Sequence, residues 1–154
     1  MSRPLLVSAC LLGLLTRYDG ASKGHAGVME WLRRHQRIPV PVCPEQLAGL
    51  PTPRSRTFFQ GGDGMGVHEG RSQVISEQGD DRSGLFLRGA RETLKIARLC
   101  GCDEALLKER SPSCGVHQVY CGEERISGLG VTTALLKSRG IAVFSEEDLD
   151  RMNP

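Results

Sequence analysis

Three cysteines, each placed after a short apolar run, constrain the fold of this chain more than any other feature. They are Cys10 after residues 4–9, Cys43 after residues 38–42, and Cys114 a few residues after 105–108. Short apolar runs bounded by Gly and Pro, with helical patterns between them, are typical of buried strands in a parallel sheet. Because the carboxyl ends of parallel strands share one edge, where ligands bind, we expect the three thiols to meet in one crevice.

Helical patterns lie between the predicted strands and set the fold class. The predicted helices are residues 28–37, 83–100 and 131–138, a last strand is expected over 141–145, and the longest helix has Leu87, Ala90, Leu94 and Ala97 on one face. Strands that alternate with helices predict a Rossmann-like α/β fold of three layers, in which helices flank a mostly parallel sheet. We find no repeat and no domain boundary, so residues 1–154 are expected to form a single domain.

Two segments depart from this alternation. Pro41 lies within a predicted strand, which places that strand at or near an edge of the sheet, because proline has no N–H to donate. The glycine-rich stretch 58–76 is expected to form a β-hairpin-like excursion that could act as a flexible flap over the crevice. Directly after Cys43, Pro44 and Glu45 suit the first turn of a short helix.

Composition and charge favour a soluble cytoplasmic protein. The net charge of +2 and the aromatic content of 5% give no sign of a surface for nucleic acid. The apolar residues before Cys10 are fewer than the ~7–15 that a secretory signal needs, and no apolar run approaches the ~18 residues of a membrane span. Six cysteines in a cytosolic chain of this length point to metal binding or catalysis and not to disulfides.

Cysteine spacing alone leaves the role of the thiols open. Zinc modules usually supply cysteine pairs with two residues between them, and none of the three strand-end cysteines has such a partner. Three thiolates could instead hold a [4Fe–4S] cluster and leave one iron open to a substrate. Buried inert cysteines are the alternative that needs no ligand.

Five blocks of the chain resemble the thiouracil desulfidase (TudS) family, formerly a domain of unknown function. The blocks are residues 8–13 (SACLLG), 17–20 (RYDG), 42–47 (VCPEQL), 49–54 (GLPTPR) and 108–115 (KERSPSCG). The resemblance implies an α/β domain with an oxygen-sensitive [4Fe–4S] cluster on Cys10, Cys43 and Cys114, and hence cluster-assembly machinery as a partner. Thr16 stands where many relatives have a further cysteine, which leaves the three-ligand interpretation intact.

The same resemblance implies an enzyme that converts the C=S group of a small thiolated pyrimidine to C=O without redox chemistry. The substrate would be thiouracil or a thiouridine nucleoside or nucleotide, with Glu45 and Ser111 as catalytic residues. A soft thione sulfur suits an exposed iron. Glu45 could act as a general base towards water, and Ser111 could donate to the substrate or serve as a nucleophile activated by Glu45. Without these roles, Glu45 would be a first-turn carboxylate and Ser111 a Ser-Pro turn residue.

Asp19 and Arg54 are further candidate substrate-binding residues. Asp19 could orient the first cysteine loop or contact the pyrimidine, and Arg54 could meet a nucleotide phosphate. The alternatives are an Asp-Gly turn residue and a solvated loop arginine.

Two other functions fit the same chain. Thiolated tRNA could be the substrate, bound by basic helix faces at Arg33, Arg34 and Arg37 and along residues 88–98, although such faces are usually only solvated. A non-enzymatic metal or cluster module would need neither of the two catalytic residues. No membrane partner is expected.

Overall fold

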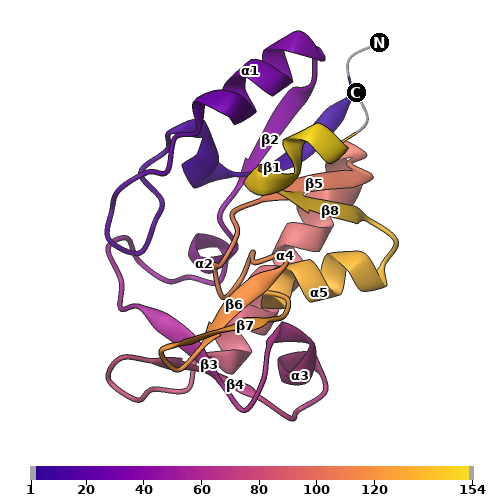
Figure 1. Ribbon diagram of the computed structural model, residues 1–154. Coiled ribbons are helices and arrows are strands. Elements are labelled where there is room, and N and C mark those ends of the chain that lie inside the picture. The colour runs from indigo at the N-terminus through magenta and orange to yellow at the C-terminus, as the bar shows by residue number, and fades with distance from the viewer. Residues whose placement is uncertain (1–2, 153–154) are drawn as a thin grey trace.

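Four parallel strands form the first of two sheets in the computed structural model, which describes residues 3–152. Their order across the sheet is β2 (Ile38–Val42), β1 (Pro4–Ser8), β5 (Glu104–Leu107) and β8 (Ala142–Ser145). β2 is an edge strand, as Pro41 predicted. This is the parallel sheet of the predicted α/β fold (Figure 1).

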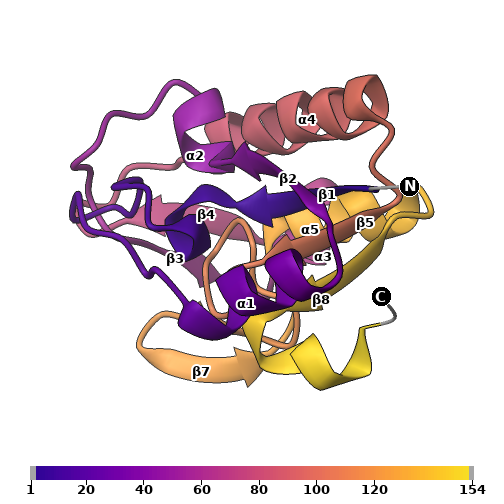
Figure 2. The same cartoon turned by 90° about the horizontal axis from the view of Figure 1, so that it is seen from above.

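Helices cover both faces of this sheet and give the predicted three layers (Figure 2). On one side lies α4 (Ser83–Cys100), which packs against α2 (Pro44–Leu47) and α5 (Val131–Ser138); on the other lies α1 (Ala26–Arg34). Side chains of β1 alternate between the layers, because Leu5 and Val7 pack in the cluster of α1, whereas Leu6 packs in the cluster of α4. Both faces of the strand are therefore buried, as expected for a continuous apolar run.

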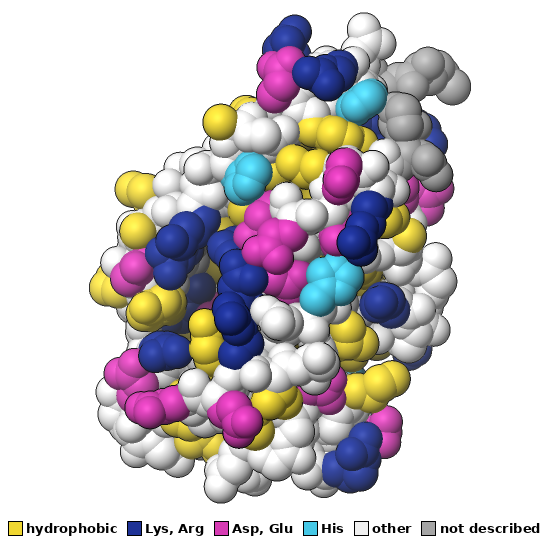
Figure 3. Space-filling view, in the orientation of Figure 1, with side chains coloured by type: hydrophobic (Ala, Val, Ile, Leu, Met, Phe, Trp, Pro, Cys, Tyr) yellow, Lys and Arg dark blue, Asp and Glu magenta, His cyan; other side chains and the backbone are white. Residues whose placement is uncertain are grey.

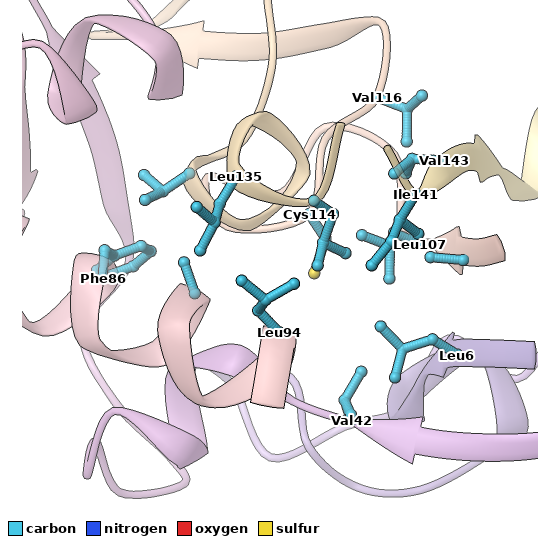
Figure 4. Packing of buried hydrophobic residues seen from close by; sticks show 14 of the residues in the cluster. Leu6, Val42, Phe86, Leu94, Leu107, Cys114, Val116, Leu135, Ile141 and Val143 are labelled. Atoms are coloured by element: carbon cyan, nitrogen blue, oxygen red, sulfur yellow. The ribbon is translucent and has the colours of Figure 1, made fainter. Parts of the chain in front are cut away.

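The larger apolar cluster lies between the parallel sheet and α4 (Figure 4). α4 has the predicted bounds, and Ala90, Leu94 and Ala97 of its predicted apolar face are buried. Leu87 is only partly buried, and the adjoining Phe86 is in the core. The helical periodicity thus located the buried face to within one residue.

A second sheet, which the sequence did not predict, adjoins the first. Its strand order is β4 (Gln73–Ser76), β3 (Thr57–Gln60), β6 (Gln118–Cys121) and β7 (Glu124–Ser127). β3 pairs with β4 and β6 with β7 in antiparallel fashion, and a parallel bridge between Phe59 and Cys121 joins the two pairs. β3 and β4 are the expected hairpin-like excursion, with α3 (Gly64–His68) between them. Because Phe59 and Val74 are fully buried, this segment is part of the core and not a free flap.

Several boundaries differ from the prediction. α1 begins at Ala26 and ends at Arg34, short of the predicted end at Arg37. Arg37 was expected to face outwards, but its side chain is buried and pairs with Glu104 of β5 at 2.9 Å. Two 3-10 helices were not predicted, η1 (Ala9–Leu12) and η2 (Glu146–Arg151), the second of which begins with a capping box.

The two sheets share apolar packing, since the larger cluster contains Leu6 from one sheet and Phe59 from the other. The organisation of residues 1–154 as a single domain stays a prediction. Within residues 3–152, every helix is too short or too polar to cross a membrane.

Candidate active site

A cavity of about 410 Å³ opens at the carboxyl ends of β1, β2 and β5. Cys10 lies in η1, Cys43 directly precedes α2, and Cys114 lies in the loop after β5; all three line the cavity. The structure therefore brings the three strand-end thiols to one place, as the parallel topology requires. Their role as ligands stays a prediction.

The other predicted residues divide between the cavity and its surroundings. Glu45, Arg54 and Ser111 line the cavity, whereas Asp19 does not. Asp19 Oδ1 accepts a hydrogen bond from the N–H two residues further on at 3.0 Å, and its carboxylate pairs with Arg17 at 3.4 Å. This is the turn geometry of the alternative interpretation. The neighbouring Arg17 lines the cavity, and contact of Asp19 with a substrate stays a prediction.

Burial keeps the three thiols protonated when nothing binds them. It raises the pKa of Cys114 to about 12 and that of Cys10 to about 11, and it also raises the pKa of Cys43. Lys108 opposes this effect at Cys10, and Arg54 opposes it at Cys43. A bound metal would therefore have to displace the thiol protons, while the nearby cations would favour the thiolates once formed.

The thiols are neighbours, but they are not arranged around one ion. Within the part of the chain that the structure describes, no three His, Cys, Asp or Glu side chains are placed to hold a single metal ion. Charges on Cys10 and Cys43 nevertheless raise the pKa of Cys114, so the three groups are within electrostatic reach of one another. Thiolates are soft ligands, which select zinc, copper(I) or iron–sulfur clusters.

Glu45 is buried in the cavity wall, and both of its carboxylate oxygens have partners. Arg54 Nε donates to Oε1 at 2.9 Å, and Ser113 Oγ donates to Oε2 at 3.0 Å. The Arg54 side chain is 6% exposed and also donates to the backbone oxygen of Thr16 at 2.8 Å. Arg54 is therefore not a solvated loop arginine, because it holds Glu45 and lies 3.8 Å from the sulfur of Cys43. Its contact with a phosphate stays a prediction.

Ser111 begins the tight turn that carries Cys114. Its Oγ accepts the N–H groups of Ser113 and Cys114, each at 3.2 Å, and lies 3.1 Å from Ser113 Oγ. The backbone oxygen of Ser111 accepts from the N–H of Gly115 at 2.8 Å. Ser111 is thus a turn residue, as its local sequence suggested, and it also lines the cavity.

Two buried residues of this region, Ser113 and Glu109, were not predicted, and each is 2% exposed. Oε1 of Glu109 accepts hydrogen bonds from the N–H groups of Arg110, Val116, His117 and Gln118. Burial opposes ionisation of this carboxyl, but the N–H groups hold the pKa of Glu109 below its usual range. Glu109 thereby ties together the two ends of the cysteine loop (residues 108–118). Its place in the block 108–115 was the one available signal, because backbone partners leave no sequence pattern.

Acidic residues of η2 hold the cysteine loop from outside. Lys108 forms an ion pair with Glu146 and Arg110 forms one with Glu147, and Nε2 of His117 lies within hydrogen-bond distance of Asp148, each at 2.8 Å. Oε1 of Glu146 also accepts the N–H of Glu109 at 2.7 Å. From the other side, the first N–H groups of α5 donate to the backbone oxygens of Pro112 and Ser113 at 2.9 and 2.8 Å. The loop that carries Ser111 and Cys114 is therefore braced by two helices.

Basic side chains gather around the mouth of the cavity, next to a hollow in the surface (Figure 3). The lining cations are Arg17, Lys23, Arg54, Arg56, Lys108 and Arg110. Arg17 stacks over Tyr18 and Arg56 over Tyr120, each 5.5 Å from the ring centroid. Four of the six cations pair with acidic residues, whereas within residues 3–152 Lys23 and Arg56 form no ion pair. These two charges are free to meet an anion.

Comparison with known proteins decides the family. The family model described as 2-thiouracil desulfurase matches residues 5–148. The chain belongs to this family. It is therefore an enzyme of the desulfurase kind, and the resemblance found in the sequence is confirmed.

Two individual proteins are similar over nearly their whole length. The chain is 37% identical over 149 residues to the uncharacterized protein YbbK of Bacillus subtilis (strain 168). The aligned residues cover 95% of this chain and 97% of that protein. It is 41% identical to the structure of the [4Fe-4S]-dependent thiouracil desulfidase TudS, with a TM-score of 0.84 and coverage of 97% of this chain and 95% of that one. The second similarity confirms the predicted fold class.

Proposed function

We propose that this protein is a non-redox desulfidase that converts the C=S group of a thiolated pyrimidine to C=O. A [4Fe–4S] cluster would be bound by Cys10, Cys43 and Cys114. The observation that carries the proposal is that these three thiols converge on one cavity whose wall also contains Glu45 and Ser111. Family membership supports it, as does the similarity to TudS, which is itself described as [4Fe-4S]-dependent.

The donor set of the cavity fits such a cluster. Three cysteines come from three different elements, and Thr16 lies on the cavity wall without offering a fourth thiol. Three thiolates would leave one iron without a protein ligand. When bound, the cluster supplies a soft Lewis acid for a thione sulfur. Lys108 and Arg54 are placed to favour the thiolate forms of Cys10 and Cys43.

The division of roles between the two carboxylates of the cavity follows from their partners. Glu109 uses one oxygen for four backbone N–H groups, so it supports the loop. Within residues 3–152 the carboxylate of Glu45 has no backbone partner, and it is held by Arg54 and Ser113 at the cavity wall. Glu45 is therefore the group that takes a proton from the attacking oxygen. Ser111, on the same wall, holds or supplies that oxygen.

The substrate that we propose is thiouracil or a thiouridine nucleoside or nucleotide, encountered in the cytoplasm. Lys23 and Arg56, which form no ion pair within residues 3–152, support a nucleotide, because a phosphate suits such donors. All six cysteines are free thiols, which fits a reducing compartment. For tRNA the support is weaker, since Arg37 is buried and Arg33 and Arg34 pair with an acid on their own helix.

The first test is the content of iron and acid-labile sulfide in protein purified without oxygen. We expect about four of each per chain, the composition of a cubane cluster, and anaerobic loss of thione absorbance when 2-thiouracil is added. Cys10→Ser, Cys43→Ser and Cys114→Ser should lose iron, whereas Cys100→Ser, which changes an exposed thiol, should retain it. Absence of both iron and sulfide after anaerobic reconstitution would overturn the proposal.

The second test separates an enzyme from a non-enzymatic cluster module. Glu45→Gln and Ser111→Ala should keep the iron content of the wild type and lower kcat by about 10² to 10⁴-fold, the usual contribution of acid–base catalysis. A cluster module predicts no turnover in any variant and no effect of either change. Full activity in one variant would remove that residue from the mechanism.

A further inference from the structure

We propose that Ser113 relays a proton from Ser111 to Glu45. This inference rests on the proposed function and names the residue that connects its two catalytic groups. In the described part of the chain Ser111 and Glu45 form no hydrogen bond with each other, whereas Ser113 contacts both. Ser113 is thus a positioning residue that acts through its neighbours.

The direction of the relay follows from the donors and acceptors. A serine hydroxyl has one hydrogen to donate, and an ionised carboxylate can only accept. Ser113 Oγ lies 3.0 Å from Oε2 of Glu45, so its hydrogen is directed there. In the 3.1 Å contact between the two hydroxyls, Ser113 must then accept and Ser111 must donate. The sulfur of Cys114, 3.6 Å from Ser113 Oγ, is the weaker competitor for the same hydrogen.

The surroundings of Ser111 support this direction. Its Oγ accepts two backbone N–H groups, those of Ser113 and Cys114, each at 3.2 Å. With its acceptor positions occupied, the hydroxyl hydrogen of Ser111 is the group that remains for Ser113. Two N–H donors aimed at one oxygen also stabilise negative charge that develops on it.

Burial makes Ser113 difficult to replace with water. Ser113 is 2% exposed, Glu45 is 9% exposed, and the second oxygen of Glu45 is held by Arg54. The backbone oxygen of Ser113 accepts the N–H of Thr132 at the start of α5, which fixes the residue from behind. The three side-chain oxygens therefore lie in a fixed order within the wall.

The transfer balances in protons and charge. The Ser111 O–H bond breaks as a new O–H bond forms on Ser113, while the Ser113 O–H bond breaks and its proton binds Oε2 of Glu45. Ser113 ends neutral, Glu45 ends as the carboxylic acid, and one negative charge has moved to Ser111 Oγ. That oxygen lines the cavity, where the substrate carbon would be attacked.

The principal experiment compares Ser113→Ala with Ser113→Thr in the anaerobically purified enzyme. Ser113→Ala should lower kcat at least about 100-fold, as loss of an acid–base element does, with KM changed by less than about threefold because no substrate contact is lost. Its iron content and visible absorption should match the wild type. Ser113→Thr keeps the hydroxyl and should recover at least about a tenth of the wild-type kcat, a loss of about 1.4 kcal/mol or less.

A matched control is Ser72→Ala, which removes a buried serine hydroxyl that donates to the backbone oxygen of Asp63 at 2.7 Å, outside the cavity. It should leave kcat and KM unchanged.

A second experiment measures wild-type kcat in mixtures of H₂O and D₂O. A purely structural role of Ser113 would not affect how kcat depends on the deuterium fraction. Transfer of two protons in the rate-limiting step should give a curved dependence on the deuterium fraction, and a linear dependence would overturn the relay even if Ser113→Ala fails to fold.

The outcomes separate this inference from the proposed function. If Glu45→Gln and Ser111→Ala lose turnover but Ser113→Ala does not, the relay is wrong and the proposed function stands. If Ser113→Ala loses iron, its role is to support Cys114, and the relay is likewise wrong. If Glu45→Gln and Ser111→Ala both keep full activity, the proposed function itself fails.

Discussion

Arg54 and Glu45 form a buried ion pair in which Arg54 also donates to backbone and side-chain oxygens of its neighbours. Arg54→Ala would leave the Glu45 carboxylate buried beside only Ser113, and breaking such a pair costs about 3–5 kcal/mol of stability. Arg54→Lys should cost less, because the charge remains while the planar fork is lost. Urea unfolding of the anaerobic protein measures both changes.

Arg33→Ala provides the comparison for this prediction, because Arg33 forms an exposed pair with Glu30 on its own helix. Exposed pairs contribute little, so its unfolding midpoint should stay close to that of the wild type. A midpoint for Arg54→Ala equal to that of Arg33→Ala would show that the buried pair does not stabilise the fold.

At this scale the sequence predicted which residues line the cavity better than it predicted their partners. Cys10, Cys43 and Cys114 could be placed because a strand end is a position that periodicity reveals. The contact of Arg54 with Glu45 joins residues nine positions apart across a loop, and no local pattern encodes it. Ser113 was missed for the same reason, since its hydroxyl reaches Glu45 across 68 positions.

Among the elements, η2 has the clearest effect on the site, because it braces the cysteine loop. Asp148 is central to it: Oδ2 accepts from the N–H of Ser145 at 2.9 Å and contacts Nε2 of His117 at 2.8 Å. Arg151 also faces this carboxylate, at 3.8 Å. Burial opposes ionisation, but the Ser145 N–H and His117 hold the pKa of Asp148 below its usual range. A depressed folded-state pKa means that this stabilisation is complete above the unfolded value and is lost as the pH falls through the folded one.

We therefore expect Asp148→Asn to be less stable than the wild type by about 1 kcal/mol at pH 6, because the amide oxygen can still accept from Ser145 but a hydrogen bond to a charged group contributes about 1 kcal/mol more than a neutral one. The difference should begin to shrink below about pH 4, the unfolded value, and vanish below the folded pKa. Fluorescence of Trp31 during urea unfolding at a series of pH values measures it. Asp150→Asn, an exposed change on the same helix, should behave as the wild type. A difference that grows with acidity would contradict the assignment.

Elements with strong periodicity were predicted well, and elements held by polar contacts were not. The buried strands and α4 follow from apolar patterns, and the edge position of β2 follows from Pro41. β6 and β7 are four residues each and are largely polar or partly exposed, so they lack a pattern that distinguishes them from loop. η2 begins with a capping box after a strand end, a signal that is visible in the sequence only once the strand is placed.

In the whole molecule, the cavity lies where the two sheets meet. The parallel sheet presents the three thiols at its carboxyl edge, whereas Tyr120 of β6 and Arg56, just before β3, line the cavity from the second sheet. The rule that ligands bind at the carboxyl edge of a parallel sheet predicted the position of the three thiols. It could not predict the contribution of the second sheet to the cavity, because the pairing of β3 with β6 joins segments that are far apart in the chain. The thiol side of the site was therefore predictable, and the side formed by the second sheet was not.

That second side should determine how the substrate is bound. Arg56 stacks on Tyr120 and forms no ion pair within residues 3–152, so a nucleotide phosphate can reach it without displacing an acid. Arg56→Ala should raise KM for 4-thiouridine monophosphate by about 5 to 20-fold, the value of one charge-assisted contact. It should leave KM for free 2-thiouracil unchanged, and added salt should raise only the nucleotide KM. Arg91→Ala, on the exposed face of α4, removes the same charge away from the cavity and should change neither value. If Arg56→Ala raised KM for both substrates equally, Arg56 would act on the pyrimidine or on the shape of the cavity, and a phosphate site at this rim would be wrong.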